Sequence, residues 1–232
     1  MKKLIIPFFC ALLFSTSVQA QQTATKAAKA SKTEAKQSKI TPKEVIDNYI
    51  KALGGKEKLE AVKTTITDNT LSVQGMEFTM STKKMGNKFK SEQKVMGQTM
   101  TQLFDGEKGY FDQMGQKNMI PADKIADLKK GKAIEALGYD AANFQTVTVE
   151  KLDGKDYNVL SSDKGQYYFD TTTGLLYKSS SKEGTAVIKS YMTVDGIKFP
   201  EEIDAEGNGQ KIIIKTTKVV INSGVTDQDF KG

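Results

Sequence analysis

The residue types that most often carry out enzymatic chemistry are scarce in this chain. It contains no His, and its one cysteine, Cys10, lies in an apolar run near the N-terminus. It contains no arginine either, so all 34 basic residues are lysines. Most acid/base, nucleophilic and zinc sites need His or Cys. What remains for catalysis is serine with lysine, or paired carboxylates.

The spacing Ser-x-x-Lys, which some serine hydrolases use, occurs four times. The pairs are Ser81/Lys84, Ser91/Lys94, Ser161/Lys164 and Ser179/Lys182. In the known chemistry the serine begins a helix beside further motifs. Here each pair falls in or beside an expected strand, where residues three apart point to opposite faces. In a chain this rich in serine and lysine, the four pairs indicate chance rather than an active site.

Two acidic pairs are the other candidates. Glu201 and Glu202 are adjacent on an expected strand and face opposite sides, so they cannot act on one bond. Asp227 and Asp229 offer two ligands, whereas calcium takes about six to eight oxygens. We therefore expect no enzyme, no metal site and no cofactor.

The N-terminus has the pattern of a secretory signal peptide over residues 1–20. A basic start precedes an apolar run over 4–14, and Val18 and Ala20 place small residues at a cleavage site. The run is too short for a permanent membrane span. We expect cleavage after Ala20 and a periplasmic protein without cysteine.

Residues 21–40 are expected to form a flexible linker rich in Lys and Ala. Residues 21–39 contain no bulky apolar side chain that could offset the entropy of ordering. A basic arm resting on anionic lipid is the alternative. Residues 1–40 account for the whole net charge of +6, and from residue 41 onward 27 lysines meet 27 acids. This balance argues against a nucleic-acid partner, which requires a basic face.

A single domain is expected over residues 41–232, with a fold that is mainly β (α+β). Thr41-Pro42-Lys43-Glu44 has the pattern of a capped helix start, and Gly54-Gly55 ends that helix. From Thr64 the apolar period is two and glycine turns recur, which indicates an antiparallel meander of about ten strands. A helical insert is expected over 121–137, broken near Gly131. Such a sheet must curl into a half-barrel, and the two helical segments would cover its concave face.

The hairpin YMTVDGIKFPEEI, residues 191–203, shows the ambiguity of that concave face. Asp195-Gly196 suits a type I′ turn, which pairs Val194 with Ile197 and Met192 with Phe199 on one apolar face. Methionine, an adaptable apolar residue, is concentrated in an earlier part of the chain. Seven methionines lie between residues 76 and 119: Met76, Met80, Met85, Met96, Met100, Met114 and Met119. These residues could line a cavity for acyl chains or fill a loosely specified core.

Five segments, taken in order, resemble one family. They are VIDNYIKALGGKEKLEAVKT, FDGEKGYF, YYFDTTTGLLYK, YMTVDGIKFPEEI and KVVINSGVTDQDF. Together they resemble the periplasmic outer-membrane lipoprotein-sorting, or lipoprotein carrier (LolA/LolB-like), superfamily over residues 41–230. The resemblance implies a curled antiparallel half-barrel whose concave apolar face receives the acyl chains of lipoproteins. An arginine under the lid holds the closed state of the well-known carrier, and this chain has none.

The resemblance implies ligand-binding residues at the inward strand positions. These are Leu71, Val73, Met76, Phe78, Met80, Met100, Phe104, Tyr168, Tyr177, Met192, Val194 and Phe199. The function it implies is a non-enzymatic carrier that transports or chaperones lipids or acylated lipoproteins, with envelope proteins as further partners. The alternative is a domain of the same fold with a filled core, which serves envelope protein–protein interaction or acts as an accessory domain.

Overall fold

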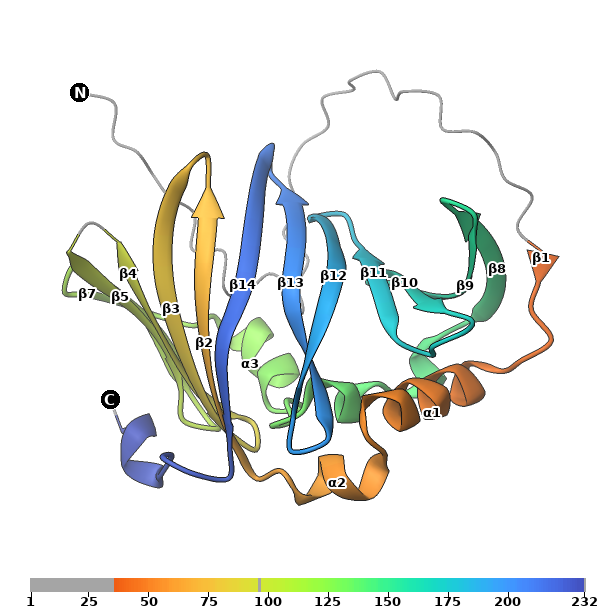
Figure 1. The fold of residues 1–232 in the computed structure, drawn as a ribbon. Coiled ribbons are helices and arrows are strands. Elements are labelled where there is room, and N and C mark those ends of the chain that lie inside the picture. Colours follow the sequence, from red (N-terminus) through yellow and green to blue (C-terminus); the bar gives the residue numbers. More distant parts are fainter. Residues whose placement is uncertain (1–35, 96, 232) are drawn as a thin grey trace.

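The computed structural model describes residues 36–95 and 97–231 (Figure 1). The expected signal peptide lies outside these residues, as do residues 21–35 of the expected linker and Met96. The described chain forms one open, curled antiparallel sheet with helices on its concave side. The expected half-barrel is therefore confirmed.

Local capping explains where the first helix, α1 (Pro42–Leu53), begins. The Glu44 N–H donates to the side chain of Thr41, and the Thr41 N–H donates to the Glu44 carboxylate over 2.7 Å. These bonds satisfy N–H groups that a helix start leaves free. The buried side of α1 consists of Val45, Ile46, Tyr49 and Leu53. A second short helix, α2 (Lys56–Ala61), buries Leu59.

Within residues 36–95 and 97–231 the sheet has fourteen strands. They are β1 (Lys36–Gln37), β2 (Thr64–Val73), β3 (Met76–Met85), β4 (Lys88–Val95), β5 (Gln98–Phe104), β6 (Gly109–Gln113), β7 (Gln116–Met119), β8 (Thr146–Leu152), β9 (Lys155–Ser162), β10 (Gly165–Asp170), β11 (Leu176–Ser180), β12 (Gly184–Val194), β13 (Ile197–Gly207) and β14 (Gln210–Ile221). Their order is β1-β8-β9-β10-β11-β12-β13-β14-β2-β3-β4-β5-β6-β7. Two meanders therefore join in the middle of the sheet, where β14 pairs with β2.

The strand count exceeds the expected ten or so because the shortest strands are too short to show an alternating pattern. One of them, β1, lies inside the segment expected to be a linker. It pairs with β8, and the Ser38 N–H donates to the Val147 carbonyl over 3.0 Å. The folded domain therefore begins before Thr41.

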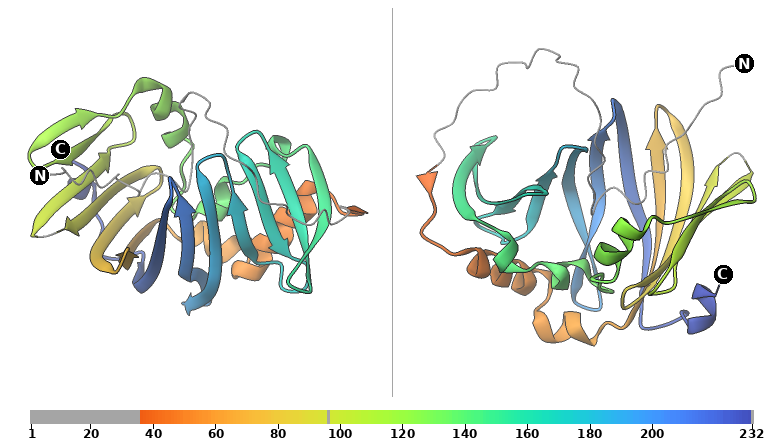
Figure 2. Two further views of the ribbon diagram at one scale, coloured as in Figure 1. Left: turned by 90° about the horizontal axis from the view of Figure 1, so that it is seen from above. Right: turned by 180° about the vertical axis from the view of Figure 1, so that it is seen from behind.

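Residues 121–144 connect the two meanders and form what we call the lid segment. It contains α3 (Ala122–Leu128) and the 3-10 helices η2 (Glu135–Gly138) and η3 (Ala141–Asn143). The expected break near Gly131 is confirmed, since the chain between α3 and η2 is not helical. The lid segment crosses the concave side of the sheet. Helices α1 and α2 lie along one end of the sheet (Figure 2).

Three groups of apolar side chains hold these layers together. The helix core packs α1, α2 and the lid segment on the β8–β13 arm: Val45, Ile46, Tyr49, Leu53, Leu59, Val62, Ile134, Ala136, Val147, Leu160, Phe169, Leu176 and Ile197. The apolar patch lies on the sheet itself: Leu71, Phe78, Val95, Met100, Ala186, Ala205 and Ile212. A third, smaller group, Tyr157, Val159 and Tyr168, is separate from both.

Candidate ligand-binding site

A single row of side chains crosses nine neighbouring strands on the concave face. Each member pairs in register with the next: Val147, Leu160, Tyr167, Ser179, Ala186, Ala205, Ile212, Val73 and Met76. Leu160 belongs to the helix core, whereas Ile212 belongs to the apolar patch. Residues paired across strands share a face, so the helix core and the apolar patch lie on one continuous concave surface.

The structure brings six of the twelve expected ligand-binding residues together at the apolar patch. They are Leu71, Phe78 and Met100, which are buried, and Val73, Met76 and Met80, which are partly buried against them. A hollow of about 50 Å³ lies beside the nine-strand row, where Tyr167, Ser179, Ala186 and Ala205 are among its lining residues. By itself it is too small for an acyl chain, because pockets for drug-sized ligands measure about 300–1,000 Å³.

Phe104 shares the concave face with Met100, four residues earlier on β5. It is fully buried against Phe89, with ring centroids 6.0 Å apart. It thus lies on the expected face, but at the far end of β5 from the apolar patch.

The 191–203 hairpin has the expected register. Val194 pairs with Ile197 and Met192 with Phe199, and Asp195 and Gly196 have φ of 51° and 76°, as a type I′ turn requires. Ile197 and Phe199 pack in the helix core. The turn also approaches the end of α1, where a Cβ on Gly54 would lie 2.5 Å from the Gly196 carbonyl oxygen. This end of the hairpin therefore seals a core.

The inward placement of Tyr168 and Tyr177 is wrong. Tyr168 pairs with Val159 in the separate third group, and Tyr177 stacks on Tyr157 with ring centroids 4.7 Å apart. The inward aromatics of β10 are Tyr167, which pairs with Leu160 of the helix core, and Phe169, which belongs to that core. Three consecutive aromatics, Tyr167-Tyr168-Phe169, carry no alternation, and the register with β11 also shifts there. The sequence holds no signal that sets their direction.

The methionines do not all form one wall. Met76, Met80 and Met100 lie at the apolar patch. Met114 and Met119, by contrast, are 69% and 62% exposed at the β6–β7 end of the sheet. Only part of the methionine cluster is therefore placed to contact a ligand on the concave face.

Below the apolar patch, the concave face of β14 and β2–β5 becomes polar. We call the uncharged residues Asn69, Thr82, Ser91, Gln93, Gln102 and Thr216 the polar belt. In one row Thr216 pairs with Asn69, Asn69 with Met80, Met80 with Gln93 and Gln93 with Met100. In the next row Thr82 pairs with Ser91 and Ser91 with Gln102. All belt residues except the half-buried Thr82 are buried. The belt is not predictable from the sequence, because Thr, Ser and Gln on a strand also suit a solvent-facing side.

A group of aromatic rings fills the space between α1 and the sheet. Tyr139 of the lid segment lies edge-on to Tyr49, Tyr167 and Phe169, with ring centroids 6.1, 5.6 and 6.3 Å away. Burial raises the pKa of Tyr49 and Tyr139 above the usual value. Within the described chain the buried Tyr139 hydroxyl has no hydrogen-bond partner, whereas Tyr191 donates to the Leu176 carbonyl over 2.6 Å.

Ion pairs of lysine tie the lid segment to the sheet. Lys84 of β3 lies 2.9 Å from Glu135 of η2, and Lys164 of the β9–β10 turn lies 3.2 Å from Asp127 of α3. Lys129 pairs with Glu107 in the β5–β6 loop. These pairs join the lid segment to β3, the β5–β6 loop and the β9–β10 turn.

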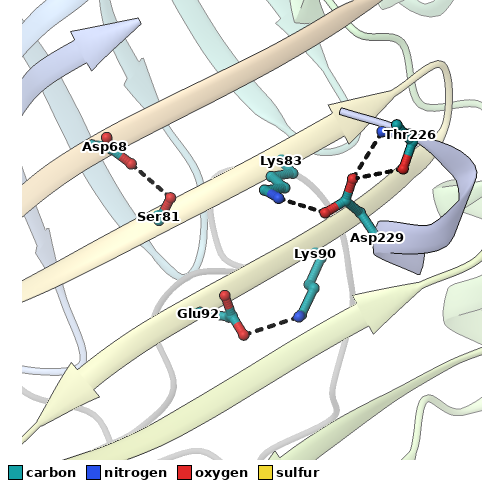
Figure 3. A network of polar contacts seen from close by, with 7 residues as sticks. All are labelled: Asp68, Ser81, Lys83, Lys90, Glu92, Thr226 and Asp229. Carbon is teal, nitrogen blue, oxygen red and sulfur yellow. Dashed lines mark hydrogen bonds and ion pairs between the residues drawn. The ribbon is translucent and has the colours of Figure 1, made fainter. Parts of the chain in front are cut away.

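The two aspartates near the C-terminus, Asp227 and Asp229, pair with lysines on the outer face of the sheet. Asp229, in the 3-10 helix η4 (Asp227–Phe230), accepts a hydrogen bond from Lys83 and one from the Thr226 N–H over 2.8 Å (Figure 3). The bond from Lys83, followed by that from Thr226, lowers the pKa of Asp229. Asp227 pairs with Lys88 over 2.5 Å. No group of three or more acidic side chains in residues 36–95 and 97–231 could hold a metal ion.

Two of the serine–lysine pairs lie within one strand each, and in both pairs the two side chains point to opposite faces of the sheet. Ser81 donates to Asp68 over 2.6 Å on the outer face (Figure 3), whereas Lys84 points to the lid segment. Ser91 belongs to the polar belt, and Lys94 on the same strand has the opposite direction.

In the described part of the chain, no helix has the length and apolar character to cross a bilayer.

Comparison with known proteins identifies the fold. No family model matches the chain, and no curated protein is significantly similar to it. Among solved structures, a LolA superfamily protein from Nitrosomonas europaea matches with a TM-score of 0.53 at 11% identity, over 83% of this chain and 98% of that one. The chain has a LolA-like fold.

Two further structures agree. An outer membrane lipoprotein-sorting protein domain from Vibrio parahaemolyticus has a TM-score of 0.52 at 10% identity, over 80% of this chain and 97% of that one. A DUF1329 family protein from Desulfovibrio piger has a TM-score of 0.54 at 12% identity, over 83% and 98%. The LolA-like fold is thus shared at very low sequence identity.

Proposed function

We propose that this LolA-like protein is a non-enzymatic carrier that binds the acyl chains of lipids or lipoproteins on its concave face. The observation that carries the proposal is the nine-strand row, which runs from the helix core into the apolar patch. Apolar side chains from both meanders face the concave side of one open sheet. Covering such apolar surface with a hydrocarbon chain is favourable, because it removes that surface from water. The likeness to a domain named for lipoprotein sorting supports the same function.

The proposed location is the periplasm. The signal-peptide pattern over residues 1–20, with cleavage after Ala20, is the basis for export. Acylated lipoproteins or lipids are the proposed ligands, and envelope proteins that deliver or accept them are the proposed partners.

The test is gentle native mass spectrometry of the mature protein, purified from its own cell envelope and then extracted with organic solvent. A stoichiometric acyl-bearing adduct would support the proposal, and its mass would give the ligand class. A bare protein that also takes up no fluorescent fatty-acid probe would refute it.

The second candidate is an accessory domain with a filled concave face. The burial of Leu71, Phe78 and Ile212 and the small hollow beside the nine-strand row favour it. A filled core would leave binding to exposed edges such as β7, whose four residues are all exposed. Pull-downs that retain an envelope partner while the protein binds no acyl probe would support this candidate.

A further inference from the structure

The polar belt is an unexpected feature of a face proposed to bind hydrocarbon chains. It lies in the two rows directly below the apolar patch, and Met80 and Met100 stand among its members in the upper row. An acyl chain on the patch would therefore end at, or run into, uncharged hydrogen-bonding groups. Hydrocarbon alone gains nothing from such groups, because buried amides and hydroxyls are costly unless they are hydrogen-bonded.

The hydroxyl groups of the belt have more hydrogen-bonding capacity than their mutual contacts use. Thr82 Oγ1 and Ser91 Oγ lie 3.0 Å apart, so one of their two protons serves this contact. The Thr216 hydroxyl lies 3.0 Å from Asn69 Oδ1 and 2.9 Å from the Pro200 carbonyl oxygen, and its single proton can serve only one of them at a time. The second proton of the Thr82/Ser91 pair can therefore be donated to a further acceptor, whereas the Thr216 proton is already shared between two acceptors.

The charge of the belt restricts what that acceptor can be. None of its six side chains is charged. Lys84, which follows on the same face of β3, is paired with Glu135 of the lid segment. A free carboxylate would lose its hydration here without gaining a counter-charge from the belt. A neutral carbonyl would need only the donors that the belt supplies.

We infer that the polar belt binds the uncharged ester or amide linkage of an acylated ligand while its acyl chains lie on the apolar patch. The inference rests on the proposed function and names the linkage chemistry that this site selects. Ser91, at the centre of the lower row, and Gln102, which lies beside it and is 3% exposed, are the residues that specify the linkage.

The test compares ligands that differ only in the linkage. Displacement of the neutral probe N-phenyl-naphthylamine would be measured with monopalmitoylglycerol, its ether analogue O-hexadecylglycerol, N-palmitoylethanolamine and palmitate. We expect the ester and the amide to bind about three- to tenfold more tightly than the ether, the range that one or two neutral hydrogen bonds provide. Palmitate should bind more weakly than the ester.

The variants Gln102→Met and Ser91→Ala should remove this preference by weakening the ester and leaving the ether unchanged. Gln116→Met, at an exposed position on β7, is the matched control and should keep the preference. Ser91→Ala is small enough to test the inference if Gln102→Met unfolds, and a thermal melt checks both. Equal binding of ester and ether by the unmodified protein, or a preference retained in both folded variants, would overturn the inference. Absence of any probe binding would instead refute the proposed function, and the inference with it.

Discussion

Lys164 Nζ lies 3.2 Å from Asp127 Oδ2, and this ion pair joins the β9–β10 turn to α3. On the other side, Lys84 joins η2 to β3. The lid segment therefore bridges the two arms of the curled sheet through side chains that stay partly exposed to solvent. Ion pairs in such positions contribute about 0–1 kcal/mol each. These ties can break and re-form without unfolding the sheet.

Removing one tie should loosen the lid segment and leave the domain stable. We expect Lys164→Met to shift the Tm by no more than a few degrees and to raise amide hydrogen exchange across residues 121–138 several-fold. High salt should have the same effect on the unmodified protein, because it screens exposed ion pairs. Lys182→Met, on the exposed β11–β12 turn, is the control. Unchanged exchange in Lys164→Met would show that other contacts hold the lid segment.

A charge on the apolar patch should abolish acyl binding. Met80 is the best position because it lies on the patch yet is only partly buried, so the fold should tolerate Met80→Glu. A carboxylate facing an acyl chain must be desolvated or neutralised, and we expect the affinity for a fluorescent fatty-acid probe to fall at least tenfold.

The matched control for Met80→Glu is Ile213→Glu, at an apolar position of β14 that is 49% exposed and lies outside the patch. Circular dichroism and a thermal melt should show both variants folded. Equal probe binding by the two variants would mean that the patch is not the binding surface.

Local features were predictable from the sequence because neighbouring residues determine them. The capping residues around Thr41 predict α1, and Asp195-Gly196 predicts its hairpin with the correct cross-strand pairs. The direction of Tyr167 and Tyr168 was not predictable, since both are aromatic and only the pairing with β9 distinguishes them. A one-residue error moves a strand's whole set of side chains to the other face.

The lid ties and the polar belt were not predictable for a different reason. Lys84 and Glu135 are 51 residues apart, and nothing near either residue identifies its partner. Gln102 is a polar residue on a strand, which from sequence alone indicates a solvent-facing position, yet it is buried on the concave face. Such features follow from how the meanders come together, and they are where the candidate site differs from a uniformly apolar one.

The C-terminal helix η4 should contribute strongly to stability. Phe230 is 2% exposed, and η4 lies against β4. Lys83 of β3 and Lys88 of β4 pair with its two aspartates. Replacing a buried Phe with Ala costs about 3–5 kcal/mol. We expect Phe230→Ala to lose stability in this range by urea denaturation, and the exposed neighbour Lys231→Ala to lose almost none. A small loss in Phe230→Ala would show that η4 is dispensable.

The tyrosines beneath α1 should make the fold sensitive to alkali. Burial raises the pKa of Tyr49, Tyr139 and Tyr191 above the ordinary value near 10. Their contribution to stability is therefore complete below about pH 10 and declines above it, because the unfolded chain then releases protons that the folded chain retains. We expect tyrosinate absorbance from these residues to appear together with the loss of circular dichroism, in one step well above pH 10.

Tyr139→Phe isolates one of these hydroxyl groups. Because the Tyr139 hydroxyl is buried without a hydrogen-bond partner among the described residues, its removal should relieve a desolvation cost of about 1–3 kcal/mol. We expect Tyr139→Phe to be more stable at neutral pH and to unfold at higher pH than the unmodified protein. Tyr191→Phe is the contrasting variant, since it removes the bond to the Leu176 carbonyl and should lower stability. If Tyr139→Phe is destabilised as well, the Tyr139 hydroxyl makes a hydrogen bond in solution, and the space beside it is polar.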